Sequence, residues 1–267
     1  MTDLESKLRA LLEAFPAKSS LYCVDMASGQ SLAAINEQAR VVSASTIKLP
    51  VLCCALDAVL QGTFSLSQFV PIEESDFCPD TQVFETEYRR DGASLWEMLY
   101  WMIVESDNTA TNAVLRLLSF DRINDYCRGL GLTKTCAQRK MLDFEAARQG
   151  RQNYTSPYDQ FRVYDLLFRG EILNEALRAV AFDFLGRVRH MDGLQRYIPD
   201  PVTIYHKPGG LDFLCHDAGI ILLPERPYFL GIFTWDGPSP EGDPRQSRFL
   251  GQLSRLVYDS LRNEVLG

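Results

Sequence analysis

Apolar positions near both ends of the chain recur every three or four residues. Two leucine-rich sets have this spacing, one ending at Pro16 and the other near the C-terminus: Leu4, Leu8, Leu11, Leu12, and Leu250, Leu253, Val257, Leu261. A recurrence of three and four places apolar side chains on one face of a helix. The pattern therefore predicts an amphipathic helix at each end of the chain.

Inside these terminal helices, apolar residues form short runs bounded by turn residues. Leu21 to Met26 and Ser31 to Ile35 flank Ala-Ser-Gly-Gln and predict a hairpin. Further strands are predicted over Val202 to His206, Ala218 to Leu223 and Tyr228 to Trp235. The predicted strands therefore gather near the two ends of the sequence.

The middle of the chain has helical periodicity instead. Helices are predicted over five segments: Thr46 to Leu60, Leu95 to Val104, Thr109 to Leu118, Pro157 to Phe168 and Asn174 to Leu185. This order predicts an α/β (α+β) fold in which both ends build one sheet lobe, residues 1–45 and 198–267, and residues 46–197 form an inserted helical lobe. Because ligand sites favour clefts between such lobes, we expect the active site there.

Composition and charge narrow the class of partner. The 267 residues are 46% hydrophobic and 23% charged, with a formal net charge of -8, which suits a globular protein with a full core. The acidic balance argues against nucleic acid, and no apolar run reaches the roughly 20 residues that span a bilayer. We expect a monomer that acts on a small molecule.

The start of the chain, MTDLESKLRALLEAFPAKSS, carries charges throughout and lacks the apolar core of a secretion signal. This favours a cytoplasmic protein, or a periplasmic or secreted one if a signal was removed. The seven cysteines are odd in number and scattered, so they predict buried thiols in a reducing compartment. The three histidines lie far from any zinc-type spacing, and neither a metal nor an organic cofactor is expected.

Ser45-Thr46-Ile47-Lys48 opens a predicted helix and is the first candidate for chemistry. An offset of three places Ser45 and Lys48 on one helix face, so a neutral lysine amine can take the proton of the serine hydroxyl. The helix N-terminus also directs N–H groups at a developing oxyanion. Taken alone, the motif fits equally a helix-capping serine followed by a solvated lysine.

Two further motifs follow. Ser106-Asp107-Asn108 comes after the apolar run Leu99 to Val104, and His206-Lys207-Pro208-Gly209-Gly210 ends a β-branched run. Taken separately, the first fits a polar turn with capping residues and the second a strand ending in a Pro-Gly turn. The order Ser-x-x-Lys, Ser-Asp-Asn, Lys-x-Gly, with gaps of about 60 and 100 residues, is the signature of class A β-lactamases and penicillin-binding proteins.

The likeness extends beyond these motifs. The segments STIKLPVL, DGASLWEMLYWMIVESDNTATN, NYTSPYDQFRVYDLL and HKPGGLDFLCHDAGIIL resemble successive blocks of the class A β-lactamase family and cover most of the chain. The resemblance implies an antiparallel five-stranded sheet flanked by N- and C-terminal helices, with an all-helical lobe inserted. It also implies a serine hydrolase that opens β-lactam amides through an acyl-enzyme, with a β-lactam or an acyl-peptide-like molecule as its substrate.

By the same resemblance, Ser45 is the acylated nucleophile, Lys48 its amine partner and Ser106 the hydroxyl that shuttles protons. Asn108 would bind the acylamide side chain and Lys207 the substrate carboxylate. Gly209 and Gly210 would line the substrate, with the N–H of Gly210 joining that of Ser45 in an oxyanion hole.

The sequence departs from the family at three places. No Glu-x-x-Leu-Asn segment supplies a base for deacylation; in RKMLDFEAARQGRQNYTSP we take Glu145 as the candidate, with Asp143 or no base as alternatives. Pro208 replaces a hydroxyl residue that helps to hold the substrate carboxylate. Ala218 stands where the family often has arginine, and we weigh Arg245 and Arg248 as substitutes against an ordinary surface role.

Three functions stay open. The first is a β-lactamase that forms and hydrolyses an acyl-enzyme on Ser45. The second is a related serine peptidase, amidase or esterase with poor β-lactam turnover, and the third a non-catalytic binding protein with a vestigial site. A Ser-His-Asp hydrolase and a nucleotide enzyme are disfavoured, because the chain has neither a Gly-x-Ser-x-Gly elbow nor a phosphate-binding glycine loop.

Overall fold

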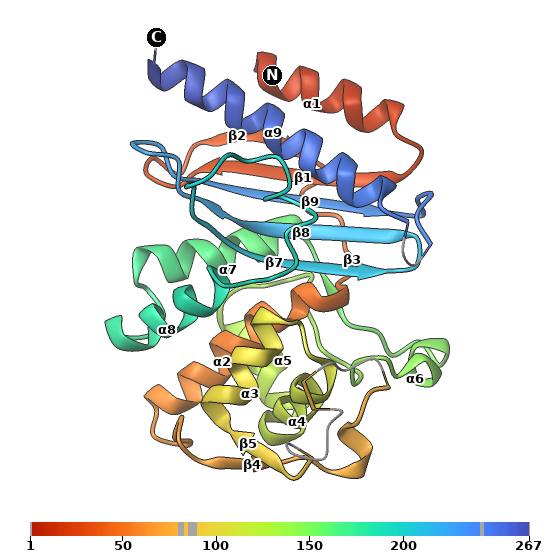
Figure 1. The fold of residues 1–267 in the computed structure, drawn as a ribbon, viewed down its shortest axis with the longest axis vertical. Helices are drawn as coiled ribbons and strands as arrows, with labels where there is room; N and C mark the ends of the chain where they lie inside the picture. The colour runs from red at the N-terminus through yellow and green to blue at the C-terminus, as the bar shows by residue number, and fades with distance from the viewer. Residues whose placement is uncertain (1, 80–82, 85–89, 241–242, 267) are drawn as a thin grey trace.

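A five-stranded antiparallel sheet forms the centre of the molecule in a computed structural model that describes residues 2–79, 83–84, 90–240 and 243–266 (Figure 1). Its strands run in the order β2-β1-β9-β8-β7. Their bounds are β1 Lys18–Asp25, β2 Ser31–Ile35, β7 Ile204–Leu211, β8 Leu214–Ile221 and β9 Tyr228–Trp235. Strands from the two ends of the sequence thus meet where β1 pairs with β9.

Helices cover both faces of this sheet. On one face lie α1 (Asp3–Ala14) and α9 (Arg245–Leu266), side by side in Figure 1. On the other face α7 (Pro157–Arg169) packs against β1, β8 and β9. The buried side chains accordingly form two apolar clusters, one on each side of the sheet, such as Leu8 with Leu253 and Val163 with Phe229. Burial of these side chains is the main favourable contribution to folding.

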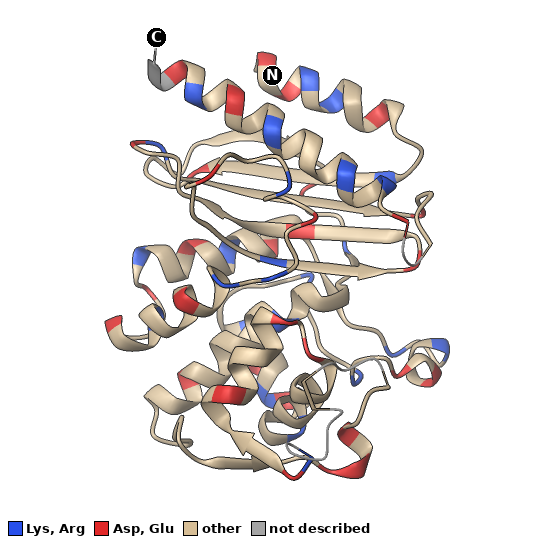
Figure 2. Ribbon diagram, viewed as in Figure 1, with Lys and Arg blue, Asp and Glu red and all other residues tan. Residues whose placement is uncertain are grey.

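The remaining helices lie below the sheet in Figure 1. They comprise α2 Lys48–Leu60, α3 Leu95–Val104, α4 Asn108–Leu118, α5 Phe120–Gly129, α6 Phe144–Arg148 and α8 Glu175–Leu185. The short elements are η1 Ala44–Ile47, η2 Glu74–Asp76, β3 Val41–Val42, β4 Phe69–Pro71, β5 Gly92–Ser94 and β6 Tyr154–Thr155. Figure 2 shows charged residues mainly on helices and loops, with few along the strands.

The predicted fold class is confirmed, with shifts at element ends. Helix α3 and strand β9 have the predicted bounds, because the Ser94 capping box starts α3 and every residue of the strand before Trp235 is buried. The predicted β7 is too short: it continues through the Pro-Gly segment to Leu211, paired throughout with β8. The division into lobes at residues 45/46 and 197/198 stays a prediction.

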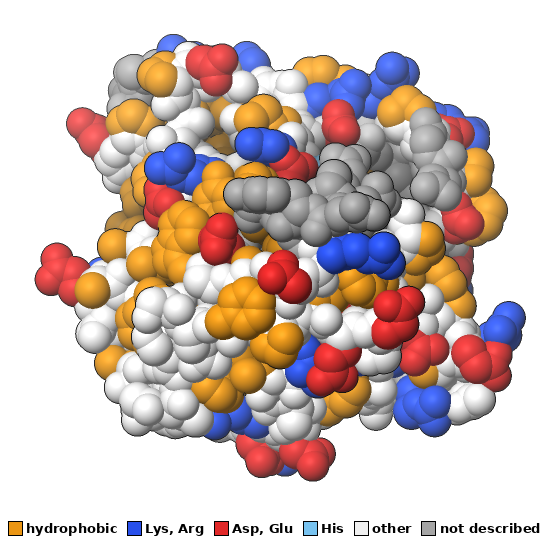
Figure 3. Space-filling model, turned by 60° about the horizontal axis from the view of Figure 1, so that its bottom comes forward, with side chains coloured by type: hydrophobic (Ala, Val, Ile, Leu, Met, Phe, Trp, Pro, Cys, Tyr) orange, Lys and Arg blue, Asp and Glu red, His pale blue; other side chains and the backbone are white. Residues whose placement is uncertain are grey.

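The helices, the surface and the cysteines show three further features. Within the described part of the chain, no helix is both long and apolar enough to cross a membrane. Seen from the helix-rich end, exposed hydrophobic side chains are interspersed with polar and charged groups (Figure 3). All seven cysteines carry free thiols, but the prediction that all are buried is wrong for Cys136 and Cys215, which are partly exposed.

Candidate active site

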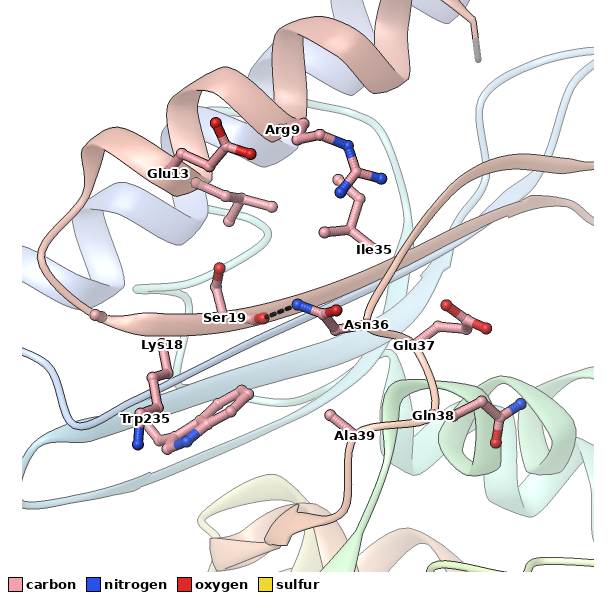
Figure 4. A pocket seen from close by; sticks show the side chains of 12 residues that line it. Arg9, Glu13, Lys18, Ser19, Ile35, Asn36, Glu37, Gln38, Ala39 and Trp235 are labelled. Atoms are coloured by element: carbon pink, nitrogen blue, oxygen red, sulfur yellow. Dashed lines mark hydrogen bonds between the residues drawn. The ribbon is translucent and has the colours of Figure 1, made fainter.

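One cavity among the described residues gathers the predicted chemistry. This active-site cavity has a volume of about 350 Å³ and is lined by Ser45, Glu105, Ser106, Asp107, Asn108, His190, Asp192, Gly193, Pro208, Gly209, Gly210, Cys215, His216 and Ser247. Another cavity, of about 660 Å³, lies between α1, the start of β1 and the segment that follows β2 (Figure 4). None of the motif residues lines that larger cavity, so size does not identify the reactive site here.

Ser45 sits in the short helix η1, immediately before α2, and is partly exposed to the cavity. Ala44, the residue before it, has a φ of 45°, a left-handed conformation that costs free energy for a residue with a side chain. Contacts on both sides hold the turn: Thr46 Oγ1 donates to Ser43 O at 2.6 Å, and Gln160 Nε2 donates to Thr46 O at 3.2 Å. The serine is therefore presented on a constrained backbone.

Lys48 begins α2 and is fully buried. Its Nζ donates to the carbonyl of Ser106 at 2.6 Å, to Ser106 Oγ at 3.1 Å and to Asn108 Oδ1 at 2.8 Å. The α3–α4 turn supplies all three oxygens, and Ser106 has a φ of 57° there. Asp107 caps α4 by accepting from Ala110 N at 2.7 Å. This turn therefore joins the first and second sequence motifs around one amine.

Lys207, from the Lys-x-Gly motif, also contacts the Ser106 hydroxyl. Its Nζ donates to Ser106 Oγ at 3.0 Å and to Pro208 O at 3.1 Å. Burial lowers the pKa of Lys207 to about 7, opposed by the negative charge of Asp217. Ser106 Oγ thus accepts from two lysine amines at once, which leaves its own proton to donate elsewhere. A hydroxyl between two amines can pass a proton from one side of the site to the other.

Strand β7 runs close to the Ser45 backbone. A Cβ on Gly209 would lie 2.8 Å from Ser45 N and 3.0 Å from Thr46 N, so only glycine fits without displacing them. Gly210 is exposed and lines the same cavity. Ser45 and Gly210 therefore lie on one cavity, which agrees with the predicted oxyanion hole in placement, while the role of their N–H groups stays a prediction.

Glu145 lies apart from this group. It belongs to the short helix α6, is exposed, and accepts from Arg148 Nε at 3.1 Å and from Gln149 Nε2 at 3.0 Å. Asp143 caps the same helix through Ala146 N at 2.9 Å. Neither carboxylate lines the active-site cavity. The role predicted for Glu145 as deacylation base stays a prediction, and this placement does not support it.

The arginines weighed as substitute cations also lie outside the cavity lining. Arg245 pairs with Asp243 and donates to the carbonyl of Pro238, and Arg248 is exposed. Ala218 is fully buried in β8, away from the lining. Cys215 is the residue of that strand that pairs with Gly210 and lines the cavity.

Several residues that line the cavity were not predicted from the sequence. Glu105, His190, Asp192, Cys215, His216 and Ser247 come from a helix end, a loop, β8 and α9. His216 is buried, and its Nε2 donates to Val42 O at 2.9 Å, which ties β8 to the segment before Ser45. Burial lowers the pKa of His216 to about 4, so the ring is neutral at pH 7. Glu105, Cys215 and His216 lie close to the motifs in the sequence, whereas no sequence signal marked His190, Asp192 or Ser247.

The described residues contain no group of three or more His, Cys, Asp or Glu arranged to hold a metal ion. The site brings together a constrained serine, the Ser106 hydroxyl on which two buried amines converge, and a glycine strand beside the Ser45 backbone. Together these groups can activate an alcohol, stabilise an oxyanion and protonate a leaving group.

Comparisons with known proteins agree with this geometry. The sequence model of the Beta-lactamase enzyme family matches residues 3–261. A beta-lactamase of Bacteroides uniformis is 24% identical, over 98% of this chain and 92% of its own. A beta-lactamase of Streptomyces cellulosae is 26% identical, over 96% of this chain and 84% of its own.

Solved structures are similar over nearly the whole chain. The structure of PBP-A superimposes with a TM-score of 0.90 at 26% identity, covering 98% of this chain and 97% of that one. A mutant of PBP-A, solved as an acyl-enzyme complex with penicillin G, gives a TM-score of 0.89 at 26% identity, with the same coverage of both chains. A beta-lactamase from Chitinophaga pinensis gives a TM-score of 0.87 at 20% identity, covering 97% of this chain and 100% of that one, which shows the shared fold.

Proposed function

The chain belongs to the beta-lactamase enzyme family, and we propose that it is a serine hydrolase that opens β-lactam amides through an acyl-enzyme on Ser45. The observation that carries this proposal is the convergence of Lys48 and Lys207 on Ser106 Oγ, at 3.1 and 3.0 Å, in the cavity that Ser45 lines. A weak nucleophile such as a serine hydroxyl needs a neighbouring base, and these amines are the bases at hand. The PBP-A acyl-enzyme complex with penicillin G supports the same chemistry in a similar fold.

In the proposed acylation, Lys48 reacts as the neutral amine, after its ammonium form, which makes the three donor bonds described above, has lost one proton. Ser45 Oγ attacks the β-lactam carbonyl and passes its proton to Lys48 Nζ. The N–H groups of Ser45 and Gly210 stabilise the negative charge that develops on the carbonyl oxygen. When the C–N bond breaks, Ser106 Oγ donates its proton to the departing nitrogen and takes one from a lysine beside it. The product is an ester between Ser45 and the opened ring, with the leaving group still attached through the former lactam.

Hydrolysis of this ester needs a water molecule and a base that reaches it. The placement of Glu145 on the surface, paired with Arg148, favours a second candidate function: a related serine peptidase, amidase or esterase that acylates readily and turns over β-lactams slowly. In that case deacylation relies on the lysine amines or on an acceptor carried by the natural substrate. A binding protein with a vestigial site is disfavoured, because both amines and both hydroxyls of the site are present.

Intact-mass spectrometry over time with a penicillin separates these functions. An adduct of penicillin mass that forms and then clears, with release of opened drug, supports a β-lactamase. An adduct that forms and persists supports the second candidate. Failure to form any adduct with a penicillin or a cephalosporin would overturn β-lactam acylation and direct the search to esters and peptides.

A further inference from the structure

Strand β1 has an uncovered side at its start. Strand β2 pairs with β1 only at Leu21 to Val24, whereas β9 pairs with it from Lys18 onward. The larger cavity, of about 660 Å³, lies at this uncovered side, between α1, Lys18 and Ser19 of β1, and residues 36–39 (Figure 4). We name it the β1-edge cavity. It occupies the place where a longer β2 would continue, and none of its lining residues belongs to the active-site cavity.

The backbone of Ser19 faces the β1-edge cavity. Its carbonyl accepts from Asn36 Nδ2 at 3.2 Å, on the side of β1 where β2 lies. Asp25 N, an even number of residues later in the same strand, donates to Gln30 O on that side at 2.9 Å. In an antiparallel sheet the N–H and C=O of one residue point to the same side of the strand, and this side alternates along the strand. The Ser19 N–H therefore also points into the cavity, where no described strand pairs with it.

Negative charge dominates the walls of the β1-edge cavity. The lining residues and the partners of their ion pairs comprise four carboxylates and two cations: Glu5, Glu13, Glu37, Asp236, Arg9 and Lys18. Each cation already has a carboxylate partner, at 2.9 Å for Arg9 and at 2.8 Å for Lys18. No described cation pairs with Glu13 or Glu37. The walls therefore favour a basic ligand, and a second copy of this chain would bring like charges against them.

The two sides of β1 present different surfaces to this cavity. In Figure 4 the Ser19 hydroxyl and Glu13 lie on one side of the strand, toward α1, and Trp235 and Ala39 lie on the other. Trp235 pairs with Lys18 at the end of β9 and is only partly buried. Side chains of an extended chain alternate between the two sides of a sheet. A chain lying beside β1 would therefore present every second residue to Glu13 and the residues between them to Trp235.

We propose that the β1-edge cavity binds an extended basic segment of a partner protein, which joins the sheet as a further strand beside β1. The segment runs antiparallel to β1, as β2 and β9 do, and its hydrogen bonds are those of strand addition at a sheet edge. The residue opposite Ser19 donates its N–H to Ser19 O, displacing the Asn36 amide, and accepts from the Ser19 N–H. The inference does not depend on the acylation of Ser45.

The position of each side chain in the segment follows from this pairing. Residues directly opposite one another in an antiparallel pair have their side chains on the same face. The residue opposite Ser19 therefore points toward α1, where a lysine or arginine meets Glu13. Its two neighbours point toward Trp235 and Ala39, where apolar side chains fit. The cavity volume of about 660 Å³ lies within the roughly 300–1,000 Å³ of ligand pockets, so the cavity has room for a short segment.

The test uses the peptide Thr-Lys-Val-Lys-Val-Lys-Thr, acetylated at its N-terminus and carrying a fluorescent dye at its C-terminus. Its binding to the full chain is measured by fluorescence anisotropy in low salt. The same peptide with glutamate in place of lysine should bind about tenfold more weakly, because the carboxylates of the cavity repel its charges. Added salt should narrow this difference, since it screens exposed charges.

N-methylation of the peptide backbone separates strand pairing from charge attraction. Methylation of the three lysine nitrogens removes the N–H that donates to Ser19 O and should weaken binding at least about tenfold. Methylation of the two valine nitrogens and that of the last threonine is the matched control. It adds as many methyl groups but removes only N–H groups that point away from β1, so it should weaken binding less than about twofold.

Two variants of the protein locate the peptide. Glu13→Gln should weaken binding of the lysine peptide about threefold, as expected for the loss of one exposed charge. Asp3→Asn is the matched control, because Asp3 is an exposed carboxylate of the same helix that lies outside the cavity. This variant should bind the peptide as wild type does.

Four results would overturn the proposal. The first is no binding of the lysine peptide up to about 1 mM. The second is equal binding of the two methylated peptides, because the backbone of β1 would then take no part. The third is an equal affinity of Glu13→Gln and Asp3→Asn for the peptide, which would place its site elsewhere. The fourth is a concentration-dependent dimer of the chain that the peptide dissociates, which would assign the edge to a second copy.

Discussion

Replacing Gly209 by alanine should disable acylation while leaving the fold intact. A Cβ at this position would lie 2.8 Å from Ser45 N, 3.0 Å from Thr46 N and 3.2 Å from Ala44 Cβ. Ordinary contacts of a Cβ atom begin near 3.4 Å, so the Ser45 nitrogen must move away from the added Cβ by about 0.6 Å. A shift of this size would lengthen a 2.9 Å hydrogen bond from the Ser45 N–H to the substrate oxygen beyond the usual range. That movement withdraws one proposed oxyanion donor.

Loss of one such donor lowers the rate about 100- to 1000-fold in a well-studied serine protease, which sets the expected size here. The assay is the second-order rate of adduct formation with a penicillin, measured by intact mass for wild type and Gly209→Ala. Thermal unfolding shows whether each variant is folded. A folded Gly209→Ala variant that acylates within threefold of wild type would refute the reasoning, because the Ser45 N–H would then be dispensable.

Two variants make the comparison specific. At Gly210 the nearest atom to an added Cβ is Leu214 O at 4.0 Å, so Gly210→Ala keeps its N–H in place and should lose far less activity, below about fivefold. At Gly129, near the end of α5 and outside the cavity, no atom lies within 4 Å of an added Cβ. Gly129→Ala therefore controls for the substitution itself and should acylate as wild type does.

Two further predictions concern Glu145 and His216. Glu145→Gln should leave the deacylation rate within about twofold of wild type, because the carboxylate pairs with Arg148 on the surface; a tenfold slower decay of the adduct would instead make Glu145 the base. Burial lowers the pKa of His216 in the folded protein to about 4, below the ordinary value of 6.5 that we take for the unfolded chain. The neutral His216 ring therefore contributes its full stability above pH 6.5. This stability is lost as the pH falls from 6.5 toward 4. The glutamine in His216→Gln can still donate to Val42 O and does not titrate. Between pH 6.5 and 4, the free energy of unfolding measured with denaturant should therefore fall by about 3 kcal/mol less for the variant than for wild type. The same fall in both proteins would contradict a buried neutral imidazole at His216.

The sequence predicted the fold well where the local signals were strong. Helix α3 has a capping box at Ser94 and an uninterrupted apolar run, and both are local features that survive any tertiary context. Strand β7 was predicted to end too early, because Pro208-Gly209-Gly210 has the composition of a turn. In the folded protein, pairing with β8 continues through this segment and overrides the turn preference.

Only some of the active-site residues could be predicted from the sequence. Spacing alone predicted Ser45 and Lys48 on one helix face. Lys207 and Ser106 are about 100 positions apart, and only the resemblance to a family put them in one site, where the structure shows their hydrogen bond. Asp192 and Cys215 could not be predicted to face the cavity. Their positions depend on how a loop packs against β8, where Gly193 lies so close to Asp217 that a Cβ would meet its Oδ2 at 2.4 Å.

The central claim is that Ser45 Oγ becomes covalently acylated, and peptide mapping of a penicillin adduct tests it most directly. Trypsin releases residues 41–48 as one peptide, VVSASTIK, which holds Ser43, Ser45 and Thr46. Fragmentation should place the added mass on Ser45, and Ser45→Ala should give no adduct while the exposed control Ser65→Ala labels normally. An adduct on another residue, or one that persists in a folded Ser45→Ala variant, would contradict the account.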